Sequence, residues 1–209
     1  MSGRDADAGA DAFFDTAFDQ CPVMVIIRGR SPEQTVDLCR QAWDLGVALV
    51  EVPIQDARAV EALRAAVAAA QGRPVGAGTV RTPEQVGIAA ETGARFIVSP
   101  GWVPALDQAA RSAGLAHLPG VATATEVGQA VDRGHRWLKA FPAAALGPAW
   151  FSAMAGPFPQ IRFVAVGGVT PDNAAAYLAA GARAVGAAGA LRRDGELARL
   201  VTAAGDARR

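Results

Sequence analysis

The chain contains a single lysine, Lys139, and this lysine lies in the apolar stretch Trp137–Pro142. Lysine and arginine together number 20, so the other 19 basic residues are arginines. Arginine keeps its proton in proteins, whereas a lysine in an apolar environment can lose its proton and become a nucleophilic amine. We therefore take Lys139 as the candidate nucleophile. The alternative is an exposed lysine that remained by chance in an arginine-rich composition.

Glu51 is the second candidate, because it is a carboxylate inside the apolar run Leu49–Ile54. Burial of a carboxylate is costly unless the group is paired or functional. Partial desolvation also raises its pKa, which suits a general acid and base. The alternative is a structural ion pair between Glu51 and Arg28.

Composition excludes several classes of function. The 209 residues are 51% hydrophobic and 19% charged with a net charge of zero, so we expect neither a nucleic-acid nor an anionic-membrane partner. No apolar run reaches the ~18 residues of a membrane span, and the N-terminus does not resemble a signal peptide, so we expect a cytoplasmic protein. His117 and His135 lack partners at metal-ligand spacing, and we expect structural histidines, no metal and no other cofactor.

Eight strand–helix units follow one another with a period in the low twenties. Helices begin after cap residues such as Ser31 and Thr123 and end at glycines. Alternating units of this kind predict a parallel sheet, and eight of them favour a (β/α)8 barrel in one α/β domain, residues 11–209. We expect residues 1–10 to be a disordered tail and a short helix at 11–18 to cap one end of the barrel. The predicted strands are 23–27, 49–54, 75–80, 96–99, 116–121, 137–141, 162–166 and 184–188.

Reactive groups of such a barrel lie where its strands end. Arg28 follows the first strand and offers a bidentate donor to a carboxylate. Thr79 ends the third strand and can donate to a ligand oxygen. Pro100 follows the fourth strand in a sharp turn with free amide donors, which is a weaker signal.

Glycines dominate the loops after the last two predicted strands, at Gly167-Gly168 and at Gly189-Ala190. These loops form the usual phosphate site of (β/α)8 barrels, built from backbone amides and a helix N-terminus. A simple turn is the alternative, because Gly-Gly also occurs at strand ends that bind nothing.

Taken together, six motifs resemble one family, the class I aldolases that cleave 2-keto-3-deoxy-6-phosphogluconate (KDPG) and 4-hydroxy-2-oxoglutarate (KHG). Pro53, Gly147-Pro148 and Val166 favour the branch that acts on 2-dehydro-3-deoxy-6-phosphogalactonate. The resemblance covers roughly residues 21–191. The motifs are Arg28-Gly29, Glu51-Val52-Pro53, Gly76–Val80, Ser99-Pro100, Leu138–Pro142 and Val166–Val169.

The resemblance implies a role for each candidate. Lys139 matches the Schiff-base lysine and Glu51 the acid and base, while Arg28 and Thr79 match the groups around the pyruvoyl carboxylate. The other matching positions form the expected substrate-binding set: Pro100, Phe141, Gly167, Gly168, Gly189 and Ala190.

Three departures from the family concern the acceptor end. Ala190 replaces a serine that usually helps to hold phosphate, Gln55 replaces a frequent arginine, and Ala143-Ala144 replaces small polar residues. The family is typically trimeric, so a homotrimer is expected.

The sequence thus predicts a metal-free, pyruvate-dependent aldolase whose partners are a small 2-keto acid and an aldehyde. Two alternatives remain at this stage. One is a barrel isomerase or synthase that binds a sugar phosphate without a Schiff base. The other is an inactive aldolase-like protein that binds a ligand.

Overall fold

The strands of the computed structural model, which describes residues 3–189 and 195–208, join in one parallel sheet with the order β5-β4-β3-β2-β1-β9-β8-β7-β6. Their bounds are β1 Val23–Ile26, β2 Leu49–Pro53, β3 Val75–Gly78, β4 Phe96–Val98, β5 Ala116–Leu118, β6 Gly120–Val121, β7 Trp137–Ala140, β8 Arg162–Val166 and β9 Ala182–Ala187.

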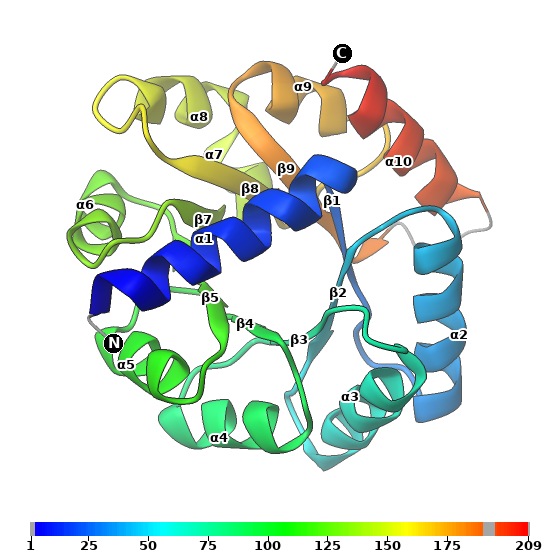
Figure 1. Ribbon diagram of the computed structural model, residues 1–209. Coiled ribbons are helices and arrows are strands. Elements are labelled where there is room, and N and C mark those ends of the chain that lie inside the picture. Colours follow the sequence, from blue (N-terminus) through cyan, green and yellow to red (C-terminus); the bar gives the residue numbers. More distant parts are fainter. Residues whose placement is uncertain (1–2, 190–194, 209) are drawn as a thin grey trace.

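β5 and β6 are two parts of one strand, separated by Pro119. β5 pairs with β4, and β6 pairs with β7. Pro119 has no N–H to donate, but its carbonyl accepts a hydrogen bond of 2.8 Å from the N–H of Lys139. The two parts therefore close the sheet into a barrel with eight strand positions (Figure 1), which confirms the predicted fold.

Helices surround the barrel, and most begin where the sequence predicts. Ser31 and Thr123 form capping boxes with Gln34 and Glu126. In the described part of the chain, no helix is both long and apolar enough to cross a membrane. The helices are α1 Gly3–Gln20, α2 Pro32–Asp44, α3 Ala57–Ala69, α4 Pro83–Glu91, α5 Pro104–Ser112, α6 Ala124–Asp132, α7 Ala143–Leu146, α8 Pro148–Ala155, α9 Ala174–Ala179 and α10 Glu196–Asp206.

The helix after β8 begins later than the sequence suggests. We expected Thr170 to cap it, but α9 begins at Ala174 with Asn173 as its N-cap. The Asn173 amide accepts a hydrogen bond of 2.8 Å from the N–H of Thr170 and donates one of 3.0 Å to the carbonyl of Gly168. These bonds hold the segment in a turn beside the two glycines.

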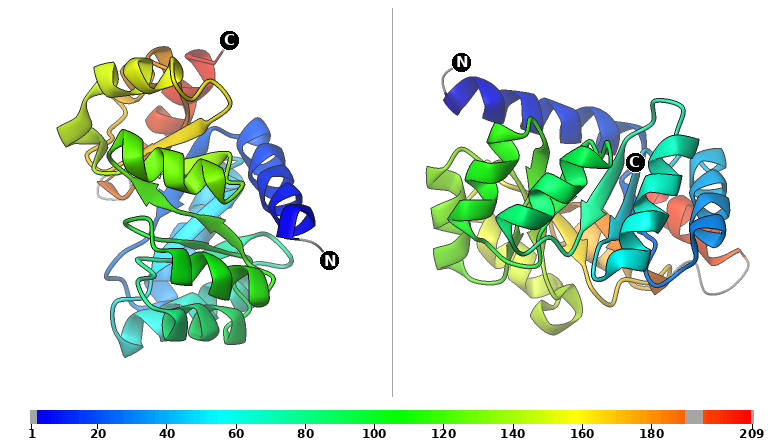
Figure 2. Two further views of the ribbon diagram at one scale, coloured as in Figure 1. Left: turned by 90° about the vertical axis from the view of Figure 1, so that its left-hand side faces the viewer. Right: turned by 90° about the horizontal axis from the view of Figure 1, so that it is seen from below.

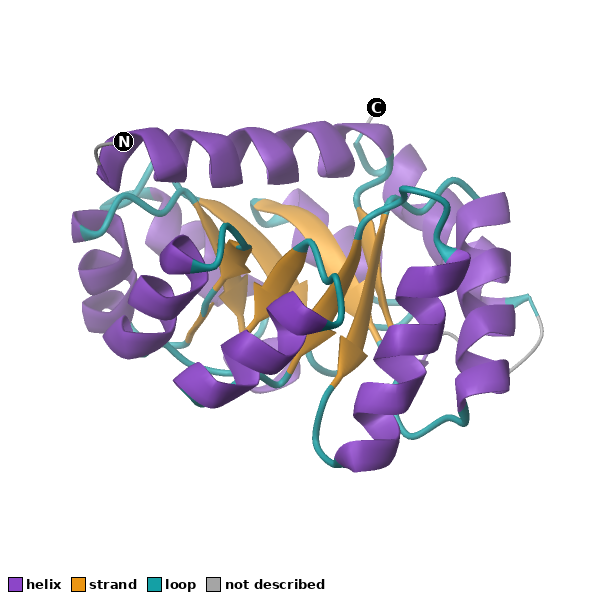
Figure 3. Cartoon of the chain, turned by 60° about the horizontal axis from the view of Figure 1, so that its bottom comes forward, coloured by secondary structure: helices purple, strands orange, loops and turns teal. Residues whose placement is uncertain are grey.

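The N-terminal helix is longer than predicted. α1 begins at Gly3, so the structure differs from the expected disordered tail for residues 3–10. Alanine, the strongest helix former, recurs in this segment and extends the helix. α1 crosses the N-terminal end of the barrel (Figures 1 and 3), and both side views of Figure 2 place it along that end.

Aromatic side chains attach α1 to the strands. Phe18 stacks on Trp137 at a centroid distance of 4.8 Å, and Phe14 meets Phe96 edge to face at 6.0 Å. Asp15 accepts a hydrogen bond of 2.8 Å from the Trp137 indole. The predicted cap over the barrel bottom is therefore confirmed.

Side chains along each strand alternate between the barrel interior and the helix layer. Leu49 and Trp137 belong to the interior cluster with Phe14 and Phe18, whereas Val50 and Leu138 pack in the outer layer. Glu51 and Lys139 lie two residues beyond Leu49 and Trp137. They therefore point into the barrel, near its C-terminal end.

Candidate active site

Lys139 lies on β7 in an apolar interior, and only 5% of the residue is exposed. Its Nζ lies 4.9 Å from the centre of the Phe141 ring. Burial lowers the pKa of Lys139; the positive charge of Arg28 acts in the same direction, and the negative charge of Glu51 opposes it. A larger fraction of this side chain is therefore free amine than in an exposed lysine.

Glu51 on β2 is fully buried, and neither of its carboxylate oxygens has a hydrogen-bond partner among the described residues. Gly78 makes room for this carboxylate, because a Cβ at that position would lie 1.9 Å from Oε1 of Glu51. Burial raises the pKa of Glu51, while Lys139 and then Arg28 act to lower it. An unpartnered buried carboxyl group of this kind can exchange a proton with a ligand.

The pKa values of Lys139 and Glu51 shift in opposite directions. Mutual attraction would favour an ion pair, but the loss of solvation outweighs it for both groups. Both side chains thus shift towards their neutral forms, an amine and a carboxylic acid. A shift of both groups in this direction favours addition of the amine to a carbonyl group.

Arg28 and Thr79 form the rim of the site. A guanidinium nitrogen of Arg28 donates a hydrogen bond of 3.4 Å to Oγ1 of Thr79. Thr79 has a φ of +56°, a left-handed conformation that is uncommon for a β-branched residue. The strained backbone and the guanidinium place two donors at the mouth of the barrel.

A pocket of about 470 Å³ opens above Lys139. Six of the ten predicted site residues line it: Arg28, Lys139, Phe141, Gly167, Gly168 and Gly189.

Gly167 and Gly168 have φ values of +97° and +79° in that wall, and a Cβ on Gly168 would lie 2.5 Å from Cβ of Ala144. Glycine is required at this wall both for the conformation and for the close approach.

The other four predicted residues have different positions. Glu51 lies beneath the pocket beside Lys139, and Thr79 is joined to it through Arg28. Pro100 packs against Gly120, where a Cβ would lie 2.2 Å from the Pro100 carbonyl, and it does not line the pocket. Ala190 lies outside the residues that the structure describes.

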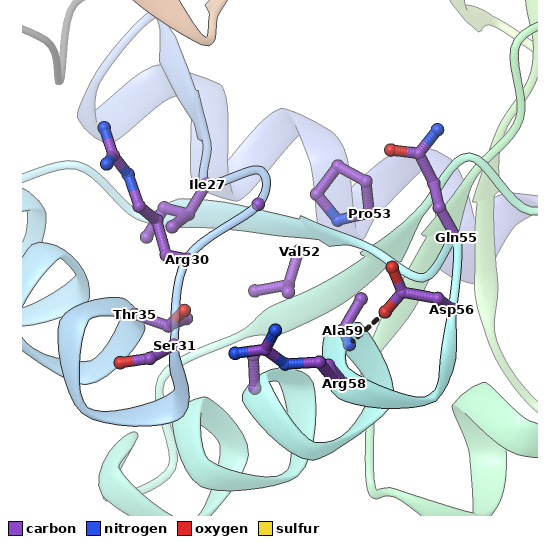
Figure 4. Close-up of a pocket in the computed structure, with 12 residues that line it drawn as sticks. Ile27, Arg30, Ser31, Thr35, Val52, Pro53, Gln55, Asp56, Arg58 and Ala59 are labelled. Atoms are coloured by element: carbon purple, nitrogen blue, oxygen red, sulfur yellow. Dashed lines mark hydrogen bonds between the residues drawn. The ribbon is translucent and has the colours of Figure 1, made fainter.

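Arg30 also lines the pocket, although we did not predict it from the sequence. The signal was present, because Arg30 follows Arg28-Gly29 in the loop after the first strand. Arg30 and Ile27 border a second pocket of about 170 Å³ as well, between α2 and α3. Figure 4 shows that Arg58 and Asp56 enter this second pocket from the β2–α3 side.

The two histidines have partners in space that their spacing in the sequence does not reveal. His135 lies 2.8 Å from Asp107 through Nε2 and Oδ1, and Nδ1 of His117 lies 3.8 Å from the same oxygen. All three residues are buried, and none of them lines the Lys139 pocket.

The raised pKa of Glu51 predicts a pH-dependent difference in stability. Above the ordinary value of 4.5, up to its folded-state pKa, Glu51 holds more proton in the folded than in the unfolded chain. The free energy of unfolding that Glu51 contributes therefore falls as pH rises through this window. Denaturant melts of the parent and Glu51→Gln across this range should show the variant gaining relative stability with pH. A constant difference would contradict the shift.

Known proteins match most of the chain. The model of the family described as KDPG and KHG aldolase matches residues 14–198. The 2-dehydro-3-deoxy-6-phosphogalactonate aldolase of Escherichia coli (strain K12) is 36% identical and covers 84% of this chain and 86% of its own length. The KHG/KDPG aldolase of the same strain is 37% identical over 76% of this chain and 75% of its own.

A solved structure extends the similarity to the fold. The KDPG aldolase from Legionella pneumophila, with pyruvate captured at low pH as a covalent carbinolamine intermediate, has a TM-score of 0.80 and 28% identity and covers 91% of this chain and 96% of its own. The identities to the phosphogalactonate and KHG/KDPG enzymes are nearly equal, so they do not separate the two branches. These matches agree with the sequence motifs and with the placement of Lys139 and Glu51 in the barrel interior. The chain therefore belongs to the KDPG and KHG aldolase family.

Proposed function

We propose that the chain is a class I aldolase that cleaves a 2-keto-3-deoxy-6-phospho sugar acid, or 4-hydroxy-2-oxoglutarate, to pyruvate and an aldehyde through a Schiff base on Lys139. The observation that carries this proposal is the placement of the only lysine, buried in the barrel interior beside a carboxyl group that has no hydrogen-bond partner among the described residues. The covalent pyruvate intermediate in the Legionella relative supports it.

The neutral amine of Lys139 would add to the C2 ketone of the substrate and give a carbinolamine. Glu51, whose protonated form is favoured by burial, would donate the proton with which the C2 hydroxyl leaves as water. The products of this step are an iminium and the Glu51 carboxylate. The positive iminium then stabilises that carboxylate, so the same group becomes a base.

Cleavage follows from this change of state. Glu51, directly or through a water molecule, takes the proton of the C4 hydroxyl as the C3–C4 bond breaks, and the aldehyde departs. The electron pair of the broken bond moves into the iminium and forms an enamine. Protonation of C3 and hydrolysis of the iminium then release pyruvate and the free amine of Lys139.

Arg28 and Thr79 would hold the carboxylate of the 2-keto acid at the rim, and the hydrogen bond between them supports this role. Gly167, Gly168 and Gly189 line the same pocket on the loops after β8 and β9, where backbone amides suit a phosphate on the acceptor. The names of the relatives support acids of the phosphogluconate and phosphogalactonate type, with 4-hydroxy-2-oxoglutarate as the unphosphorylated counterpart.

A coupled assay tests the proposal. The purified chain is supplied with each of the three acids, and pyruvate is measured as lactate formation by lactate dehydrogenase. Cleavage of at least one acid, together with a borohydride-trapped pyruvate adduct on the protein, is the expected result. Cleavage without a trapped adduct would favour a barrel enzyme that forms no Schiff base. The absence of both would favour an inactive ligand-binding protein. A homotrimer stays a prediction from the family resemblance, and a cytoplasmic location stays a prediction from the sequence.

Gly78→Ala should lower kcat by about 10²-fold, because a displacement of about 1 Å of a catalytic group can have an effect of this size. The new Cβ would lie only 1.9 Å from Oε1 of Glu51, and the flexible carboxylate, not the backbone, would move. Gly87→Ala is the matched control, since a Cβ on Gly87 meets nothing within 4 Å. Steady-state kinetics of the two variants provide the comparison. A parent-like kcat for Gly78→Ala would show that the carboxylate position is not critical.

A further inference from the structure

The two histidines of the chain meet in one buried cluster with Asp107, on the outer side of the barrel. Asp107 belongs to α5, His117 to β5, and His135 immediately precedes β7. Ala116 and Leu118, the neighbours of His117, belong to the interior cluster, so the imidazole points away from the barrel interior towards α5.

Hydrogen bonds around His117 determine which ring nitrogen carries a proton. Ser99 Oγ donates its single proton to the carbonyl of Gly101 at 2.9 Å, because that carbonyl can only accept. The hydroxyl oxygen, 2.9 Å from Nε2 of His117, must then accept a hydrogen bond from it. The proton of the neutral imidazole is therefore on Nε2, and Nδ1 presents a lone pair.

That lone pair is not satisfied in the described part of the protein. Nδ1 of His117 is buried without a hydrogen-bond partner, and it faces Oδ1 of Asp107 at 3.8 Å. A lone pair and a carboxylate oxygen repel each other in a buried site. A proton on Nδ1 would turn this contact into an ion pair but would not form a hydrogen bond, because 3.8 Å is beyond hydrogen-bond distance. A cation between the two atoms would satisfy both.

Oδ1 of Asp107 faces both imidazoles of the cluster. Arg111 binds the other oxygen, Oδ2, at 3.1 Å and so fixes the carboxylate. His135 adds a second imidazole nitrogen, Nε2, at 2.8 Å from Oδ1. The three ligand atoms lie within 4.8 Å of one another.

These distances suit a tetrahedral metal ion. Zinc binds imidazole and carboxylate ligands at about 2.0–2.1 Å, which separates neighbouring ligand atoms by about 3.3–3.4 Å. Oδ1 of Asp107 lies 2.8 Å from Nε2 of His135 and 3.8 Å from Nδ1 of His117, one distance below this value and one above it. Small side-chain movements would therefore complete the tetrahedral geometry. Two imidazoles favour zinc-like transition metals over magnesium or calcium.

We propose that Asp107, His117 and His135 form a binding site for one divalent transition-metal ion of the zinc class. The ion would join α5, β5 and the start of β7 on the outside of the barrel, with Ser99 and Arg111 orienting its ligands. Binding requires that His135 give up its Nε2 proton to solvent or to Nδ1, as is usual for a metal-bound imidazole. The site is separate from Lys139, so its test does not depend on the aldolase mechanism.

The test uses the full chain without an affinity tag, so that His117 and His135 are the only imidazoles present. Protein stripped of metal with a chelator is titrated with Co²⁺, which reports tetrahedral coordination by its visible absorption. The expected result is one Co²⁺ per chain, displaced by Zn²⁺, and a melting temperature that rises with Zn²⁺. The parent must bind Co²⁺ more tightly than His117→Leu, and equal binding overturns the proposal.

Three variants separate a metal site from a hydrogen-bonded cluster. His117→Leu removes the unsatisfied nitrogen at similar volume, so it should lose the Zn²⁺-dependent rise in melting temperature while its metal-free melting temperature is equal to or above that of the parent. Ser99→Ala keeps all three ligand atoms and should weaken metal binding by about 10–100-fold, because it removes the group that orients His117. Asp15→Asn is the matched control, since Asp15 is also paired with an arginine, Arg162, and should bind metal as the parent does. The site would be contradicted if Asp15→Asn lost as much metal binding as His117→Leu. It would also be contradicted if the melting temperature of His117→Leu still rose with Zn²⁺.

Discussion

Lys139→Arg should abolish aldol cleavage, with a loss in kcat on the order of 10⁵-fold or more, as for covalent nucleophiles in other enzymes. The substitution keeps a positive charge but removes the chemistry, because a guanidinium stays protonated and offers no lone pair to the C2 ketone. The burial that lowers the pKa of Lys139 has no such effect on arginine. Steady-state cleavage of the preferred 2-keto acid measures the loss.

The single lysine makes the covalent test unusually clear. Incubation of the parent with pyruvate and borohydride should add one reduced pyruvyl group, and peptide mass spectrometry should locate it on Lys139. The double variant Arg136→Lys/Lys139→Arg keeps one lysine in the chain but moves it to a position whose side chain is 61% exposed. This control should form no adduct above that of the N-terminal amine. Turnover close to that of the parent in either variant would disprove the role of Lys139.

Much of the fold could be predicted because each unit carries its own boundaries. Ser31 and Thr123 determine helix starts through local hydrogen bonds, so the sequence alone reveals them. The predicted start of α9 was wrong for the opposite reason. Asn173 bonds to Thr170 and to Gly168, and this turn depends on the glycine loop after β8. The break at Pro119 likewise depends on the neighbouring strands, which pair with the two sides of it separately.

Only part of the candidate site could be predicted, because residue type is visible in the sequence and the shape of a loop is not. Lys139 and Glu51 stand out by residue type, and the alternation along their strands is enough to point them inward. Arg30 was missed because its position depends on the shape of the loop after β1, not on its type. The Asp107 cluster was missed because α5, β5 and the start of β7 bring its members together only in the folded barrel. Metal-ligand spacing along the sequence cannot detect such a set.

Glu51→Gln should reduce kcat by about 10²–10⁴-fold, the usual effect of losing a positioned acid and base. Glutamine has nearly the same shape, and it removes a carboxyl group whose burial is costly, so the variant should fold at least as stably as the parent at neutral pH. The amine of Lys139 remains, and so should the ability to form the iminium, although more slowly. The variant should therefore still be trapped by pyruvate and borohydride.

These expectations distinguish a catalytic from a structural Glu51. A structural carboxylate would show its loss in the melting curve, with kcat changed only a few-fold. A catalytic one leaves the melting curve intact and separates adduct formation from turnover. The pH profile adds a second criterion, because Glu51 must be protonated to expel water from the carbinolamine and ionised to accept the C4 proton. The parent should therefore lose kcat on both sides of an optimum, and Glu51→Gln should lose the pH dependence that this carboxyl group causes. A variant that keeps the full profile and nearly full turnover would assign the proton transfers to another group.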